Sequence, residues 1–514
     1  MLDVLVIRCG FLSIEYFIFP LVFLHKTTNY SIGFLQKMTN YSIGFLQNYC
    51  VIHLFLVPLH RFLINILIMY IERHIDSYLL DWKNNAEHKP LLLRGARQVG
   101  KTTAIKHLGK QFEYFIEANF EKQKDLKLLF EKGLPIKEVV ARIGSIYDTP
   151  IIPGKTLLFL DEIQVCPEAI HSLWFFREDY PELHVVAAGS LLEFALKGLH
   201  SYGVGRIRSL FMYPLSFDEF LQAHGKTNWL QKKREATCEN PLFDELHNPL
   251  VEQFRSYLMV GGMPASVVSW IKHSDYVLCQ EELSDIVQSY FDDFSKYSSK
   301  ISPRILRLTF QSVVQQLGKK FVYSHVEGNY RTEEIKEALD LLCDAGLIYR
   351  VQRTAANGLP LGAEVNLKFN KYIILDTGLL LTILNNSTNS NLLSAEILSS
   401  TATDLVNKGS LTEMVAGCEL IKYSRPNVKQ DLYYWENLSK NATSEVDYIL
   451  SRDMQVIPLE IKAGTSGKMK SLRYFMEKKQ LKYAIRSSLE NFARLENDGI
   501  DIIPLYALSN LFRE

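Results

Sequence analysis

The chain has 514 residues, enough for about three domains of ordinary size. Lys plus Arg and Asp plus Glu are both 57, so no global charge directs the chain toward nucleic acid or a membrane, and any such surface must be local. The seven cysteines include no C-x-x-C pair, and their odd number and wide spacing indicate neither a disulfide framework nor a zinc knuckle. This pattern favours a cytoplasmic protein.

Residues 1–71 differ in composition from the rest of the chain. FLSIEYFIFPLVFL and FLINILIMYI are almost wholly apolar, and TNYSIGFLQ occurs twice, at 28–36 and 39–47. The apolar runs are shorter than the roughly 20 residues that a spanning helix needs, and no basic region precedes the first run as in a signal peptide. We interpret residues 1–68 as an extension outside the native fold, with membrane association as the alternative.

A nucleotide-binding motif follows the strand expected over residues 91–94. The segment GARQVGKT has the spacing G-x-x-x-x-G-K-T, and a helix is expected directly after it. In this motif backbone N–H groups surround the phosphates, the lysine reaches the β and γ phosphates, and the threonine hydroxyl binds Mg²⁺. The residues expected to hold ATP here are Gly95, Ala96, Gln98, Val99, Gly100, Lys101, Thr102 and Thr103.

Polar residues follow later strands at positions suited to hydrolysis. KTLLFLDEIQ contains Asp161, expected to hold Mg²⁺ through the metal's water shell, and Glu162, expected to orient and activate the attacking water. HVVAAGS ends at Ser190. In P-loop ATPases with an added strand between the two motif strands, a residue there senses the γ-phosphate, although a turn serine explains Ser190 equally well. Arg206 is the candidate arginine finger, with Arg208 and an ordinary surface role as alternatives.

The middle of the chain is helical in pattern. Residues 213–300, interrupted by a turn at 261–264, are expected to form a helical lid. Residues 301–385 are expected to form three helices and then apolar strands, the order of a winged helix. Its basic residues could contact DNA phosphates, and a solvated surface explains their spacing equally well. They are Lys319, Lys320, Arg331, Lys336, Arg350 and Arg353.

A hairpin is expected within SEVDYILSRDMQVIPLEIKAG, residues 444–464. A tight turn at Asp453 and Met454 would put Asp447 opposite Glu460, and side chains paired across antiparallel strands are about 5 Å apart. Glu460 and Lys462 share one face because strand side chains alternate. Two carboxylates and a lysine therefore converge, which suits Mg²⁺ binding and phosphodiester cleavage. A salt-bridged cluster without turnover is the alternative.

The motifs together resemble the bacterial and archaeal AAA-like P-loop ATPases that carry a C-terminal restriction-endonuclease-like domain of unknown function. The resemblance rests on PLLLRGARQVGKTT, LLFLDEIQ, AAGSLLEF, GRIRSLFMYPLSFDEF, YLMVGGMPASV, LDTGLL and the hairpin segment. It implies a further acidic ligand, Glu413. The expected metal ligands are then Thr102, Asp161, Glu413, Asp447 and Glu460, and the candidate catalytic residues are Lys101, Glu162, Arg206, Asp447, Glu460 and Lys462.

We therefore predict an α/β protein that hydrolyses ATP with Mg²⁺ and couples hydrolysis to a nuclease-like, DNA-directed C-terminal domain. The alternative is a switch in which ATP controls binding of a nucleic-acid or protein partner without cleavage. ATP and Mg²⁺ are the expected cofactors, and DNA and further copies of the chain are candidate partners. The predicted segments are the extension at 1–68, the P-loop ATPase core at 69–212, the helical lid at 213–300, the winged-helix-like module at 301–385 and the nuclease-like domain at 386–514.

Overall fold

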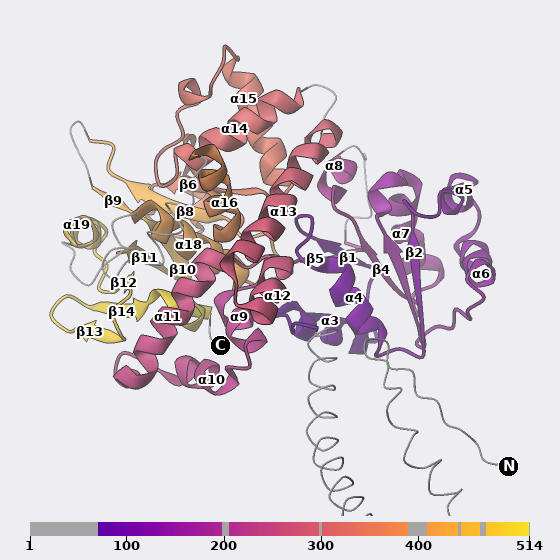
Figure 1. The fold of residues 1–514 in the computed structure, drawn as a ribbon, viewed down its shortest axis with the longest axis horizontal. Coiled ribbons are helices and arrows are strands. Elements are labelled where there is room, and N and C mark those ends of the chain that lie inside the picture. Colours follow the sequence, from indigo (N-terminus) through magenta and orange to yellow (C-terminus); the bar gives the residue numbers. More distant parts are fainter. Residues whose placement is uncertain are drawn as a thin grey trace, which may run out of the picture. The chain divides into compact units, whose positions relative to one another are not determined.

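Figure 1 shows a computed structural model of the chain. The structure describes residues 70–197, 205–297, 301–388, 409–439, 444–462 and 469–512. Contacts divide the chain into two units, Met1–Met69 and Tyr70–Glu514. The predicted extension at 1–68 lies outside the described residues. Within those ranges no helix is both long enough and apolar enough to cross a membrane.

A parallel five-stranded sheet carries the predicted nucleotide motif. Its strands are β1 (Leu91–Arg94), β2 (Tyr114–Asn119), β3 (Thr156–Asp161), β4 (His184–Ala188) and β5 (Arg208–Phe211). They are arranged in the order β2-β3-β4-β1-β5, so β4 lies between the two motif strands as expected. Because all strands are parallel, the residues that follow β1, β3 and β4 meet at one edge.

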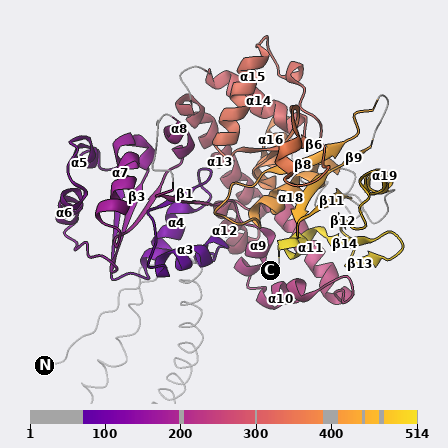
Figure 2. The same cartoon turned by 180° about the vertical axis from the view of Figure 1, so that it is seen from behind.

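Helices cover both faces of this sheet (Figures 1 and 2). Alternate strand residues point to opposite faces, and Leu91 and Leu93 belong to one core while Leu92 belongs to another. Burial on both faces explains why these strands are continuous apolar runs in the sequence. The helices on the Leu92 side are α5 (Leu126–Glu131), α6 (Ile136–Ile146) and α7 (Pro167–Asp179), and those on the Leu91 side are α3 (Ile75–Asn84) and α4 (Lys101–Gly109).

A run of helices follows the sheet, as expected for residues 213–300. The first begins with a capping box, in which Ser216 and Glu219 satisfy each other's backbone N–H groups. The expected turn at 261–264 joins two of the helices. The helices after β4 are α8 (Leu192–Lys197), α9 (Phe217–Ala223), α10 (Thr227–Glu235), α11 (Asp244–Val260), α12 (Pro264–His273) and α13 (Tyr276–Tyr297).

Residues 301–385, called the middle segment below, contain fewer long helices than expected. Among its described residues, α14 (Pro303–Gln315) and α15 (Thr332–Asp344) are long, and between them lies only the short turn η3 (Tyr323–His325). An antiparallel pair follows, β6 (Ile348–Thr354) and β7 (Val365–Ile374), and then α16 (Thr377–Thr388). These two strands join β8 (Leu432–Glu436) and β9 (Glu445–Val446) in the order β7-β6-β8-β9, so one sheet contains strands of the middle segment and of the C-terminal segment.

The C-terminal segment contains a second five-stranded sheet, in the order β10-β11-β12-β14-β13. Both views show α18 beside its strands (Figures 1 and 2). The elements are α18 (Gly409–Lys422), β10 (Tyr448–Arg452), β11 (Gln455–Ile461), α19 (Lys470–Lys479), β12 (Ala484–Ser488), β13 (Ala493–Leu495), β14 (Ile500–Pro504) and η6 (Leu505–Phe512).

The predicted hairpin forms with the predicted register. Tyr448 pairs with Leu459, and the turn residues Asp453 and Met454 have φ of 49° and 59°, as a two-residue hairpin turn requires. The first strand differs from the expectation because it is divided at Asp447. The residues before Asp447 form β9 and pair with β8, whereas those after it form β10 and pair with β11. The chain therefore passes from one sheet to the other at Asp447.

Candidate functional site

The loop between β1 and α4 has a backbone conformation that requires glycine at two of its positions. Gly95 and Gly100 have φ of 143° and 101°, and a Cβ atom on Gly95 would lie 2.1 Å from the carbonyl oxygen of Met212. Lys101 Nζ donates to the carbonyl oxygens of Gly95 and Ala96, at 2.8 Å each. Burial lowers the pKa of Lys101 to about 8. The ammonium therefore lies over the loop, where phosphate oxygens can replace the two carbonyls.

A hydroxyl and a carboxylate face each other beside this loop. Thr102 Oγ1 lies 3.5 Å from each carboxylate oxygen of Asp161. Asn119, the last residue of β2, donates from Nδ2 to Asp161 Oδ2 at 3.1 Å. Burial, together with the charge of Glu162, raises the pKa of Asp161 to about 6. One hydroxyl and one carboxylate are oxygen donors that fit Mg²⁺ bound partly through water.

Glu162 lies next to the tip of β4. Gln164 Nε2 donates to Glu162 Oε2 at 2.7 Å, and the backbone nitrogen and Oγ of Ser190 each lie 3.4 Å from the same oxygen. A Cβ atom on Gly189 would lie 1.9 Å from Gln164 Oε1, so the glycine makes room for this contact. The structure thus brings Glu162 and Ser190 together. Sequence reasoning missed both Gln164 and Asn119. The position of Asn119 at the end of a strand, opposite Asp161, could have indicated it.

Arg206 is not brought to this site. It lies just before β5, whose first residue, Arg208, pairs with Leu91 at the start of β1. The nucleotide loop follows the other end of β1, so Arg206 is at the opposite edge of the sheet. Its Nε contacts Glu178 Oε1 at 2.7 Å, and its guanidinium lies 4.6 Å from the centre of the Trp174 ring. An arginine-finger role for Arg206 would require a nucleotide bound to another copy of the chain.

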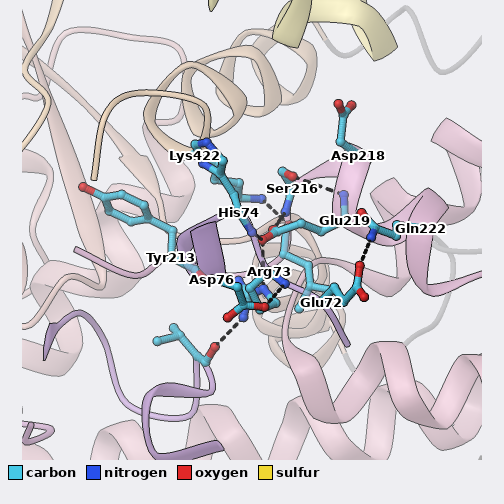
Figure 3. A network of polar contacts seen from close by, with 12 residues as sticks. Glu72, Arg73, His74, Asp76, Tyr213, Ser216, Asp218, Glu219, Gln222 and Lys422 are labelled. Atoms are coloured by element: carbon cyan, nitrogen blue, oxygen red, sulfur yellow. Dashed lines mark hydrogen bonds and ion pairs between the residues drawn. The ribbon is translucent and has the colours of Figure 1, made fainter. Parts of the chain in front are cut away.

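A buried arginine that sequence reasoning missed supports the nucleotide loop (Figure 3). Arg73 donates from Nη1 to the carbonyl oxygen of Val99 at 2.9 Å and from Nη2 to that of Tyr213 at 2.7 Å. Its Nε forms an ion pair with Glu219 Oε1 at 3.0 Å, and both side chains are less than one-tenth exposed. Glu219 also accepts from the backbone N–H groups of His74 and Ser216. The loop is therefore tied to the start of α9.

The same segment is tied to α18. The backbone N–H of Phe217 donates to Glu419 Oε2 at 2.9 Å, and the Tyr257 hydroxyl donates to Glu419 Oε1 at 2.6 Å. Lys422 Nζ donates to the carbonyl oxygen of Leu215 at 3.1 Å and pairs with Glu419. One helix of the C-terminal segment is thus anchored beside the residues that support the nucleotide loop.

Three carboxylates gather at the other end of α18. Glu413 from α18, Glu445 from β9 and Asp447 each offer a carboxylate oxygen, and these oxygens lie within 4.8 Å of one another. We call Glu413, Glu445 and Asp447 the acidic cluster. Asp447 Oδ2 accepts the backbone N–H of Ile461 at 2.8 Å, which fixes it beside the end of β11. Glu445 was not predicted, although period-two alternation puts it on the same face as Asp447.

The predicted Glu460 and Lys462 lie next to the acidic cluster. Lys462 Nζ contacts Glu460 Oε1 at 2.5 Å. Burial, together with the charge of Asp447, raises the pKa of Glu460 to about 7, and burial also raises the pKa of Glu413 and Asp447. Glu460 is 4% exposed, and its Oε2 is buried without a hydrogen-bond partner among the residues that the structure describes. Glu460 is not among the three carboxylates whose oxygens lie within 4.8 Å of one another, but a buried carboxylate oxygen without a partner among the described residues is a group that suits a divalent cation.

Lys371 of β7 enters the acidic cluster from the middle segment. Its Nζ lies 2.8 Å from Glu413 Oε1 and 2.5 Å from Glu445 Oε1, and its side chain is 2% exposed. Burial alone would lower the pKa of Lys371, but the charges of Glu413 and Glu445 outweigh burial and raise it. No sequence signal indicated this residue, because it comes from a strand distant from the hairpin.

The basic residues predicted for DNA contact are partly engaged within the chain. Lys320 pairs with Glu436 at 2.8 Å, Arg331 pairs with Glu334 at 3.4 Å, and Arg350 pairs with Asp340. Arg353 donates to the carbonyl oxygen of Glu436 at 3.2 Å. These contacts favour a solvated, internally paired surface for several of the residues.

Three solved structures that resemble the chain are distant from it in sequence. The Aeropyrum pernix ORC1 protein in complex with DNA is 12% identical over 63% of this chain and 94% of that chain, with a TM-score of 0.27. The S. cerevisiae Hsp104–ADP complex is 12% identical over 53% and 38%, with a TM-score of 0.24. A STAND protein with a tetratricopeptide repeat sensor from Pyrococcus horikoshii is 12% identical over 68% and 48%, with a TM-score of 0.25. TM-scores this low carry no functional conclusion.

Family models match three consecutive parts of the chain. An "AAA domain" model matches residues 87–221, "Domain of unknown function (DUF8612)" matches 251–390, and "Domain of unknown function (DUF4143)" matches 408–508. No curated protein matches the chain. The first match covers the parallel sheet and the nucleotide loop described above. The chain therefore contains an AAA-type, ATPase-like domain with a P-loop.

Proposed function

We propose that the chain is a Mg²⁺-dependent ATPase whose AAA-type domain works together with a nuclease-like C-terminal domain that binds a divalent ion. The observation that carries the first half is the meeting of Lys101, Thr102, Asp161 and Glu162 at one edge of a parallel sheet. The second half is supported by the acidic cluster and by the buried Glu460 oxygen, which has no hydrogen-bond partner among the described residues.

Each residue of the first site has a chemical task. The backbone N–H groups of residues 95–102 and the Lys101 ammonium bind the β and γ phosphates, and the ammonium exchanges the carbonyls of Gly95 and Ala96 for phosphate oxygens. Thr102 and Asp161 hold Mg²⁺, which when bound offsets charge on the phosphate oxygens. Glu162 orients the attacking water, and Ser190, beside the same carboxylate, senses the γ-phosphate.

Replacement of Glu162 by Gln tests this assignment in the full chain. The amide keeps the size of the side chain but removes the base, so hydrolysis should fall by about 100-fold or more while ATP still binds. Glu168→Gln, an exposed position in the first turn of α7, is the matched control and should hydrolyse ATP normally. Normal hydrolysis by Glu162→Gln would contradict the assignment.

The second site suits cleavage of a phosphodiester. The acidic cluster, together with the neighbouring Glu460, supplies the carboxylates that would hold a divalent ion, and Lys462, beside Glu460, would activate water or stabilise the charged phosphorane. Plasmid DNA with Mg²⁺ is the direct substrate test, and Glu460→Ala should abolish cleavage. Glu477→Ala, exposed on α19, is the control and should leave cleavage intact.

A switch without cleavage is the second candidate. It is favoured by one observation: Lys371 and Lys462 already neutralise carboxylates of the site within the chain. In this alternative ATP controls the binding of a nucleic acid or protein by the C-terminal segment. Intact ATP hydrolysis, Mg²⁺-independent DNA binding and absence of cleavage would favour the switch.

A further inference from the structure

We propose that Lys371 is the internal counter-cation of the acidic cluster and that it sets the affinity of this cluster for a divalent ion. The proposal rests on the metal site proposed above and goes beyond it. It gives a positioning role to a residue of the middle segment, so that the metal site is controlled from outside the C-terminal segment.

The positions of the charges lead to this role. Lys371 Nζ contacts Glu413 Oε1 and Glu445 Oε1, two of the three carboxylates whose oxygens could surround an ion. An ammonium that bridges two carboxylates occupies the place that a shared divalent ion would take. Three carboxylates this close repel one another strongly in a buried setting. Either the Lys371 ammonium or a divalent ion must offset that repulsion. Lys371 and a metal would therefore compete for the same carboxylates.

The backbone around Lys371 keeps the ammonium in place. Lys371 pairs with Val351 of β6, β6 pairs with β8, and β8 pairs with β9, which carries Glu445. The centre of the Tyr434 ring lies 5.0 Å from Lys371 Nζ, so the ring would offer the ammonium a second favourable contact if a metal took the carboxylates. The lysine can thus be displaced from Glu413 and Glu445 without becoming an isolated buried charge.

A purely structural role for the Lys371 ion pairs would lead to a different experimental result. If Lys371 only holds β7 against α18, its removal destabilises the fold and leaves metal affinity unchanged. If Lys371 competes with the metal, its removal raises metal affinity, and the metal restores the stability that was lost. Metal binding and metal-dependent stability therefore separate the two roles without any measurement of cleavage.

Mn²⁺ binding to the nucleotide-free full chain tests the proposal, with free Mn²⁺ followed by electron paramagnetic resonance. Lys371→Met should bind Mn²⁺ about 10-fold more tightly than the unmodified protein. Adding Asp447→Asn should remove that binding. Mn²⁺ should also raise the melting temperature of Lys371→Met more than that of the unmodified protein. Lys368→Met, exposed on the same strand, is the matched control and should change neither quantity.

The outcomes distinguish this proposal from the one on which it rests. Unchanged affinity in Lys371→Met, with Asp447-dependent binding in the unmodified protein, would overturn the role of Lys371 and leave the metal site standing. Absence of Asp447-dependent Mn²⁺ binding in every protein would overturn both. If Lys371→Met does not fold, Lys371→Gln replaces it, because glutamine keeps a hydrogen-bond donor but has no charge. This variant should also bind Mn²⁺ more tightly, and unchanged affinity would again overturn the role of Lys371.

Discussion

The nucleotide loop and the acidic cluster are built in opposite ways. The loop is one continuous stretch whose shape comes from glycines, with side chains added from the ends of β3 and β4 in the same sheet. The acidic cluster takes its carboxylates from α18, from β9 and from Asp447, where the chain passes between two sheets, and Lys371 of β7 pairs with two of them. At the first site backbone carbonyl groups accept hydrogen bonds from the Lys101 ammonium, whereas at the second a lysine from a distant strand pairs with two carboxylates. Local sequence therefore determines the shape of the nucleotide loop, whereas tertiary packing assembles the acidic cluster.

Loss of Arg73 should have the largest effect. Arg73→Met leaves the buried Glu219 without its ion pair and Val99 without its hydrogen bond, so the free energy of unfolding should fall by about 3–5 kcal/mol. Urea unfolding of the full chain measures this. Arg142→Met is the control, because its pair with Glu138 is exposed on both sides and should contribute no more than about 1 kcal/mol. An equal fall in the free energy of unfolding in both variants would show that the buried Arg73 contacts contribute no more to stability than an exposed ion pair.

Removal of the Lys101 ammonium should have the second largest effect. Lys101→Ala should lower the rate of ATP hydrolysis by about 100-fold, because the ammonium stabilises charge on the transferred phosphoryl group. Lys106→Ala, on the same helix but pairing with Glu117 at a half-exposed position, should hydrolyse ATP normally. Mn²⁺ binding by the acidic cluster should be unchanged in both variants. A parallel loss of Mn²⁺ binding would mean that the two sites are not separately built.

The two sites should respond to pH in opposite directions. The carboxyl groups of the acidic cluster and of the neighbouring Glu460 would bind a metal only when they are ionised, so Mn²⁺ affinity should rise about 10-fold between pH 6 and 8, through the pKa of Glu460 of about 7. ATP affinity of the nucleotide-free protein should fall above pH 8, where Lys101 loses its proton. Titrations at several pH values measure both. Mn²⁺ affinity that is constant over this range would exclude Glu460 from the site.

Without metal, the free energy of unfolding should fall as the pH rises. Because the pKa of Glu460 is raised in the folded state, its contribution to stability is full below its usual value of about 4.5 and is lost as the pH rises through about 7. Glu413 and Asp447 shift in the same direction. Mn²⁺ should therefore stabilise the protein more at pH 8 than at pH 6, and Glu460→Gln should weaken this difference.

The smallest effect is expected at Gly189. A methyl group there displaces Gln164 Oε1, which weakens the hold of Gln164 on Glu162 while the fold accommodates the flexible side chain. Gly189→Ala should lower kcat by less than about 10-fold and leave KM nearly unchanged. Steady-state kinetics separates the two constants. Gly154→Ala is unsuitable as a control because Gly154 has positive φ, so Gly358→Ala, where nothing lies within 4 Å, serves instead. A rise in KM alone would place Gln164 in nucleotide binding.

Sequence alone predicted the parts that depend on local pattern. The strand before the nucleotide loop has the expected bounds, Leu91–Arg94, and the hairpin has the expected register because two turn residues fix it. The division of the hairpin strand at Asp447 was not visible, since both halves are equally rich in β-forming residues. Arg73 and Lys371 could not be identified, because their partners are distant in sequence and only packing brings them together.

The most direct test of the whole account is plasmid cleavage by the full chain with Mg²⁺, measured with ATP, with a non-hydrolysable ATP analogue and without nucleotide. The account predicts that cleavage depends on the nucleotide, that Glu460→Ala abolishes it, and that Glu162→Gln uncouples it from ATP turnover. Cleavage that is equal in all three conditions would contradict coupling between the two sites. Absence of cleavage with normal ATP hydrolysis would contradict the nuclease assignment and leave the switch.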